Sequence, residues 1–255
     1  MTLSPDALAL SGSMAVAAGL VGAFALMRRM TLAADALSHV ALPGIGLALL
    51  VRIEPLPGAL AALAAGAVLI WVLERRTRLA TEAIIGVVFS AALAVGALLT
   101  TGEALMDALF GAPGTLSSWE VVAGVAGAAA VIAFIWLARD RLIVALVSRD
   151  IAITAGIDVK RLDLVYLLAF ALTVALGLRY LGVLLMGSLL IIPAATARAL
   201  ARDLRGMLGI SVGVALLSTL LGAWLAAQLH RESGPLIVLV ASVCFFLASM
   251  RPRRI

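Results

Sequence analysis

Residues 28–48 decide the fold of this chain; they read RRMTLAADALSHVALPGIGLA. Two arginines end one apolar run, and Asp35 and His39 lie four residues apart inside the next run. On a helix, side chains with this spacing project from the same face. An ionisable residue inside a transmembrane segment is costly, which makes it a candidate for a pathway or binding role. Pro43, followed directly by glycine, is expected to kink the helix beyond the pair and to serve as a gating position.

The composition around this stretch is that of a polytopic membrane protein. The 255 residues are 64% hydrophobic and 13% charged, with a mean hydropathy of +1.18, whereas roughly 25% of residues are charged in soluble domains. The net charge of +5 does not indicate nucleic-acid binding, because the basic residues fall between apolar runs and form no patch. The single cysteine, Cys244, excludes a disulfide framework and a thiolate metal cluster.

Nine apolar runs can be drawn, most of them near the roughly 20 residues that cross a bilayer as a helix. They cover approximately 7–26, 31–51, 55–73, 83–100, 120–138, 163–178, 181–198, 207–228 and 235–250. The sixth and seventh runs are short and joined only by Arg179 and Tyr180, so eight spans plus a partial or re-entrant helix is an alternative to nine. The predicted fold is all-α: residues 1–255 form one transmembrane helical bundle without a soluble domain.

The connecting charges predict the orientation. With alternating sides, only Arg52, Arg179 and Arg231 of the 19 basic residues fall on one side of the membrane. Cytoplasmic loops of membrane proteins are enriched in Lys and Arg. The N-terminus is therefore expected outside and the C-terminal tail in the cytoplasm. Asp6 precedes the first run and arginines follow it, the reverse of a signal peptide, so this run is expected to remain as a span.

Two connecting segments stand out. The longest cytoplasmic one, about residues 139–162, mixes charges with isoleucines, and it is either an amphipathic interfacial helix or a docking element for a cytoplasmic partner. Asp150 would lie near the start of a short helix there, and Gly156 would end it. The longest external segment carries Glu103 and Asp107 at helical spacing. These acids either attract cations as entry ligands or belong to an ordinary solvated loop.

Missing motifs exclude several enzyme classes. There is no GxxxxGK[ST] phosphate-binding loop, no HExxH zinc site and no GxSxG nucleophile elbow. Asp35 and His39 remain as a partial ligand set for a borderline divalent cation such as Zn²⁺ or Mn²⁺, with water or a second chain completing the shell. The alternatives are a hydrogen bond between the two side chains, or Asp35 as a cap at the helix start. Counting about 1.5 Å per residue from Thr31 puts His39 only about 12 Å along the helix.

Two weaker candidates lie towards the C-terminus. His230 lies just after the eighth run and is a possible entry ligand, although a histidine beside Arg231 is usually just solvated. Pro193 lies inside an apolar run that ends in arginines. A proline there removes a backbone hydrogen bond and marks a kink, which suits a gate but is also common in membrane bundles.

Four stretches together resemble the membrane subunit of zinc/manganese-type ABC importers in their order and spacing. They are RRMTLAADALSHVALPGIGLA (28–48), SRDIAITAGIDVKRL (148–162), GSLLIIPAATARALAR (187–202) and SGPLIVLVASVCFFLAS (233–249). The resemblance implies an all-helical permease that pairs as a homodimer and binds no permanent cofactor. It also implies two copies of a cytoplasmic ATPase and an extracytoplasmic metal-binding protein as partners.

The resemblance also assigns roles to residues. Asp35 and His39 match the Asp-x-x-x-His positions of the metal pathway, and the segment centred on Asp150, Ala152 and Gly156 looks like the loop that couples to the ATPase. The chain would then be a transport subunit and not itself an enzyme. A different class stays open from the residues alone: a self-sufficient secondary metal transporter or channel, in which Asp35 would also carry protons.

Overall fold

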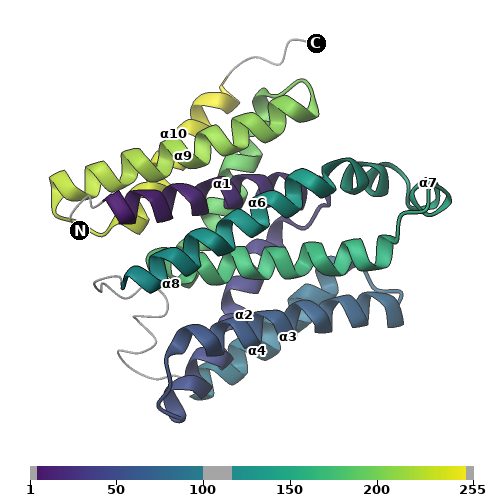
Figure 1. The fold of residues 1–255 in the computed structure, drawn as a ribbon, viewed down its shortest axis with the longest axis horizontal. Helices are drawn as coiled ribbons and strands as arrows, with labels where there is room; N and C mark the ends of the chain where they lie inside the picture. Colours follow the sequence, from purple (N-terminus) through teal and green to yellow (C-terminus); the bar gives the residue numbers. More distant parts are fainter. Residues whose placement is uncertain (1–4, 100–116, 251–255) are drawn as a thin grey trace.

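The computed structural model describes residues 5–99 and 117–250; within these ranges the side chains of residues 31–34 and 179–185 are not described. The described residues form helices and contain no strand (Figure 1). The helices are α1 (Pro5–Met27), α2 (Thr31–Leu50), α3 (Pro55–Arg76), α4 (Thr81–Leu99), α6 (Ser118–Val147), α7 (Arg149–Thr154), α8 (Val159–Leu200), α9 (Leu204–Leu229) and α10 (Ser233–Ser249). The predicted all-α class is confirmed.

Six of the described helical segments are long and apolar enough to cross a membrane. Three shorter apolar segments, 35–50, 186–200 and 233–249, accompany them. Most predicted runs match these segments within a few residues, since their boundaries carry clear signals. One such signal is Pro55 at the first position of α3, where its missing N–H costs nothing.

The segment around residues 139–162 differs from the prediction because the preceding helix extends into it. α6 does not stop at Ala138 but continues to Val147, and the short helix α7 and the start of α8 take up most of the remainder. The reason is that Leu142 and Ala145 extend the stripe of buried residues that α6 presents to the core. The charged residues Arg139, Asp140 and Arg141 therefore lie within a helix and do not end it.

The sixth and seventh predicted runs belong to one continuous helix, α8, which has 42 residues. A straight helix of that length would be about 63 Å long, twice the roughly 30 Å hydrocarbon thickness of a bilayer. Figure 1 shows that the two halves of α8 run in different directions, with the second half behind α1. Pro193 is buried inside this second half, and the helix continues past it as α2 does past Pro43.

The helices meet through small residues, as expected in lipid, where close backbone approach replaces the hydrophobic effect. A methyl group at Gly44 would overlap the carbonyl oxygen of Gly58, so α2 and α3 are almost in backbone contact. A methyl group at Gly22 would likewise overlap the carbonyl oxygen of Leu190, where α1 crosses the second half of α8. Gly22 and Gly44 therefore serve the close packing of helices.

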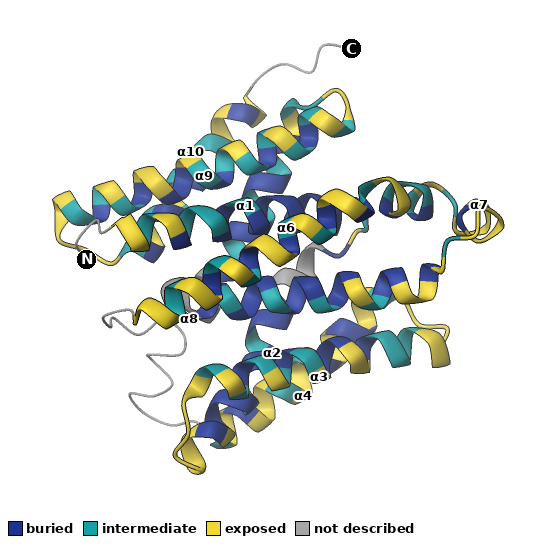
Figure 2. Ribbon diagram, in the orientation of Figure 1, coloured by how far each residue is buried: buried dark blue, intermediate teal, exposed yellow. Residues whose placement is uncertain are grey.

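Burial is greatest in α1 and in the first half of α8 and lower in the other spanning helices (Figure 2). In α1, 67% of the spanning window is buried, whereas in α4 only 22% is buried. α4 exposes large apolar side chains such as Val87 and Leu98, which suits a face turned to lipid or to another chain.

α3 ends and α8 begins at the same end of the bundle as α7 (Figure 1). This agrees with the predicted grouping of basic residues; that this end faces the cytoplasm stays a prediction.

Candidate functional site

α2 begins at Thr31, as predicted, and carries Asp35 and His39 on successive turns of one face. Asp35 is exposed on the surface of the single chain and His39 is half-buried. The first residue of α2 is preceded by Met30 as N-cap, so Asp35 does not cap the helix. One of the two alternatives to a metal-binding role is therefore wrong.

The hydrogen bond of His39 determines which of its nitrogens is free. Nδ1 of His39 lies 3.0 Å from the backbone carbonyl oxygen of Asp35, and the hydroxyl of Ser38 donates to the same oxygen at 2.7 Å. Because a carbonyl oxygen can only accept, Nδ1 carries the proton and donates it. In neutral His39 the lone pair is then on Nε2, which is the usual arrangement of a metal-binding imidazole. The contact of His39 is with the carbonyl of Asp35, so the carboxylate is not held by the imidazole.

Two neighbours shape the surroundings of the pair. The ring of Phe89 from α4 meets the ring of His39 edge to face, with centroids 5.4 Å apart. Gly187 from α8 lies against Asp35: a methyl group there would be 2.9 Å from the Asp35 Cα and 3.3 Å from Oδ1. The sequence alone did not point to this contact. The only signal was a Gly187–Ser188 pair of small residues within an apolar run.

One chain supplies only part of a metal shell. Within residues 5–99 and 117–250, no group of three or more His, Cys, Asp or Glu side chains comes together. A protein site for Zn²⁺ normally has three or four such ligands. His230, an exposed C-cap of α9 with φ 50°, does not join Asp35 and His39 in a cluster. The other candidate entry ligands, Glu103 and Asp107, lie outside the described residues.

The predicted docking element is the helix α7, at one end of the bundle (Figure 1). The Ser148 hydroxyl caps its start by accepting from the Ile151 N–H at 3.3 Å, and Asp150 lies in its first turn. Gly156, with φ +78°, ends the turn that follows, in the left-handed conformation that glycine adopts most easily.

The two faces of α7 differ in what they contact. Ala152 is fully buried against the core of its own chain, whereas Ile151 and Ile153 are 59% and 61% exposed. Ala152 therefore anchors α7, and the flanking isoleucines are the side chains that α7 offers outwards. The sequence showed the isoleucines of this segment, and the resemblance pointed to Ala152. Neither indicated which of them is buried, because a six-residue helix has too few turns for its buried face to be read from periodicity.

Comparisons with known proteins cover almost the whole chain. The model of the ABC 3 transport family matches residues 2–252. The high-affinity zinc uptake system membrane protein ZnuB of Haemophilus influenzae is 29% identical, over 92% of this chain and 92% of its own. The manganese transport system membrane protein MntC of Listeria monocytogenes is also 29% identical, over 95% of this chain and 88% of its own. A chain of the structure titled PsaBC from Streptococcus pneumoniae in complex with Fab has 25% identity and a TM-score of 0.84, covering 98% of this chain and 91% of that chain.

Proposed function

The chain belongs to the ABC 3 transport family, and we propose that it is the membrane permease through which an ATP-driven importer moves Zn²⁺ or Mn²⁺ into the cytoplasm. The observation that carries the proposal is the Asp35–His39 pair on an accessible face of α2, with Nε2 of His39 free to bind. A carboxylate oxygen and an imidazole nitrogen suit both ions. The zinc and manganese relatives are equally identical to this chain, so the proposal names both metals.

A second copy of the chain completes the site in this proposal. Asp35 is exposed although it lies in an apolar helix, and at four-residue spacing it is followed by the half-buried His39 and Pro43 and the exposed Leu47. A two-fold symmetric pair would bring the same surfaces together and double the ligands to two carboxylates and two imidazoles. Four ligands match the number that Zn²⁺ prefers. The homodimer therefore explains why one chain carries only half a shell.

The remaining partners follow from the family and from α7. A cytoplasmic ATPase would dock against α7 and supply the energy, and an extracytoplasmic metal-binding protein would deliver the ion at the opposite end. In this orientation the N-terminus is outside and α7 is in the cytoplasm. Pro43 and Pro193 are proposed as the positions where α2 and α8 bend during the transport cycle.

Reconstitution distinguishes this function from that of a self-sufficient transporter. We expect proteoliposomes that contain the permease, its ATPase and the metal-binding protein to take up ⁶⁵Zn²⁺ or ⁵⁴Mn²⁺ only when ATP is supplied on the ATPase side. Liposomes with the permease alone, under an imposed pH gradient, serve as the control and should show no uptake above empty liposomes. Rapid uptake by the permease alone would replace the importer with a secondary transporter or channel.

A further inference from the structure

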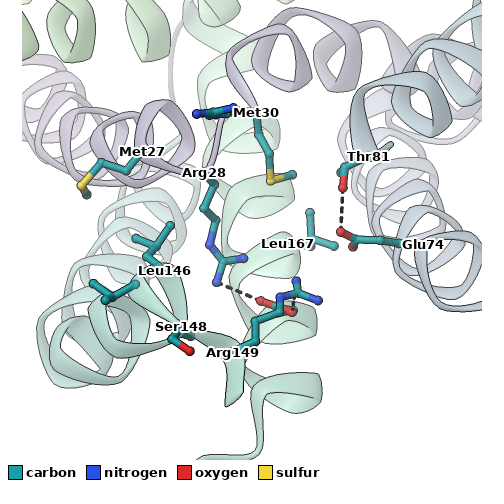
Figure 3. A pocket seen from close by; sticks show the side chains of 13 residues that line it. Met27, Arg28, Met30, Glu74, Thr81, Leu146, Ser148, Arg149 and Leu167 are labelled. Carbon is teal, nitrogen blue, oxygen red and sulfur yellow. Dashed lines mark hydrogen bonds and ion pairs between the residues drawn. The ribbon is translucent and has the colours of Figure 1, made fainter. Parts of the chain in front are cut away.

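A buried carboxylate next to α7 links three elements that are distant in the sequence. Asp163, in the second turn of α8, is only 8% exposed. Its Oδ1 lies 2.9 Å from Nη2 of Arg28, and its Oδ2 lies 3.0 Å from Nη2 of Arg149. Figure 3 shows the two arginines reaching the carboxylate from different elements. We call this chain of three side chains the Asp163 bridge. Arg28 and Asp163 lie outside the proposed metal and docking sites, whereas Arg149 is the first residue of α7.

The Arg28 end of the bridge belongs to a rigid turn. α1 ends at Met27, and the N–H of Met30 donates to the carbonyl of Ala25 at 2.9 Å while the N–H of Arg29 donates to that of Leu26 at 3.2 Å. This is the Schellman pattern, here with Arg29 at φ 59° in the left-handed position. α2 starts directly after this turn, so a displacement of Arg28 is passed to the helix that carries Asp35.

Asp163 itself is held in a fixed place. One turn before it, the carbonyl of Lys160 accepts from the indole N–H of Trp71 on α3 at 3.0 Å. One turn after it, the buried Tyr166 donates from its hydroxyl to the carbonyl of Val21 on α1 at 3.0 Å. The guanidinium of Arg28 stacks on the ring of Tyr166, 4.4 Å from its centroid. The start of α8 is thus bound to α3 and α1, and these contacts hold the backbone on both sides of Asp163 in place.

The Arg149 end of the bridge is the exposed one. Arg149 is the first residue of α7, and its side chain is 63% exposed. A cavity of about 380 Å³ lies beside the bridge, lined by residues of the α1–α2 turn, the ends of α3 and α6, and the starts of α4 and α8. It includes Glu74, which accepts from the hydroxyl of Thr81 at 2.7 Å (Figure 3). Arg28 and Arg149 both line this cavity, so it leaves room for their side chains to shift.

We infer that Asp163 is a positioning residue that passes movement of α7 to the metal pair on α2. This inference rests on the proposed function, because it assumes an ATPase on α7 and a metal at Asp35 and His39. Motion of α7 acts on Asp163 through Arg149, Asp163 acts on Arg28, and the rigid α1–α2 turn moves the first turns of α2. The carboxylate suits this role because it binds both arginines at once, one with each oxygen.

The test compares D163N with the wild type in the complete permease–ATPase complex in lipid. In the wild type, a non-hydrolysable ATP analogue is expected to change the affinity for Mn²⁺ by about fivefold or more, because coupled sites shift each other's equilibria. In D163N this nucleotide-dependent change should fall below about twofold, and metal uptake per ATP hydrolysed should drop roughly tenfold. Binding of the ATPase and its hydrolysis rate should stay near wild type in D163N. If Asp163 only held the fold together, both properties would fall with the coupling. D163E is expected to restore part of the coupling.

E74Q is the matched control, because it makes the same carboxylate-to-amide change in the same cavity without touching the bridge. It should keep the nucleotide effect on Mn²⁺ affinity. An undiminished nucleotide effect in D163N, or loss of ATPase binding in it, would overturn the inference. If the wild-type complex itself shows no ATP-driven uptake, the proposed function fails instead, which separates the two results.

A second variant keeps the inference testable if D163N does not accumulate in the membrane. R149Q changes a largely exposed side chain and is expected to fold. Because Arg149 belongs to the docking helix, R149Q is compared with the wild type at saturating ATPase, so that the complex is fully formed in both. The inference predicts that the R149Q complex loses the effect of nucleotide on Mn²⁺ affinity, and an unchanged nucleotide effect in that complex would count against it.

Discussion

Metal uptake is expected to fall by about two orders of magnitude or more when Asp35 or His39 is replaced by alanine. Outer-shell partners of a metal site already cost roughly 10–100-fold when they are removed, and these two residues are proposed as direct ligands. The chain should still fold, because Asp35 is exposed and His39 is only half-buried, so neither substitution empties the core. The measurement is uptake of radioactive Zn²⁺ or Mn²⁺ by cells that lack their own importer, normalised to the amount of permease in the membrane.

S90A is a suitable control for these variants. Ser90 is an exposed polar side chain on α4 and follows Phe89, the residue that contacts His39. Its hydroxyl donates only to the backbone of its own helix, at 2.9 Å from the Gly86 carbonyl, so its loss should leave uptake unchanged. Normal uptake by a D35A/H39A double variant that is present at wild-type level would remove the pair from the pathway.

An arginine at Ile151 is expected to detach the ATPase from the permease. Ile151 is 59% exposed on α7, and an apolar side chain at the centre of a protein interface is a typical hot spot. A buried, unpaired arginine there should cost about 2 kcal/mol or more, which corresponds to a roughly 30-fold weaker complex. Purification of the tagged permease followed by quantification of the bound ATPase measures the effect.

L79R is the matched control for I151R. Leu79 lies between α3 and α4, and it has the same 59% exposure as Ile151 without belonging to α7. It should therefore retain the ATPase. Stoichiometric ATPase in the I151R preparation would show that α7 is not the docking element.

Several features of the fold follow from the sequence because their causes are local. The apolar runs predict the helices, and Gly156 predicts the end of α7 through its left-handed backbone. The Asp35–His39 spacing places both side chains on one helix face without knowledge of the tertiary structure. The resemblance seen in four short stretches is confirmed by the family match over residues 2–252.

Other features depend on contacts between distant residues and could not be predicted. α6 runs past Arg139 and Arg141 because Leu142 and Ala145 pack on other helices, which outweighs the charges as a stop signal. The two halves of α8 form one helix because the junction at Arg179 and Tyr180 contains no helix breaker, although its apolar pattern is interrupted. Asp163 looks like an ordinary charge at the start of an apolar run until the fold brings Arg28 to it across 135 positions of sequence. A single sequence contains no signal for such a pairing.

The most direct test of the account is whether His39 binds the transported metal. Electron spin-echo envelope modulation of Mn²⁺ on the purified permease, in lipid nanodiscs and with a histidine-free tag, detects a directly bound imidazole nitrogen. His39 and His230 are the two histidines of the chain, so the source of such a nitrogen can be assigned with two variants. The account predicts nitrogen modulation in the wild type and in H230A, and its loss in H39A. The same modulation in H39A, or none in the wild type with Mn²⁺ bound, would contradict it.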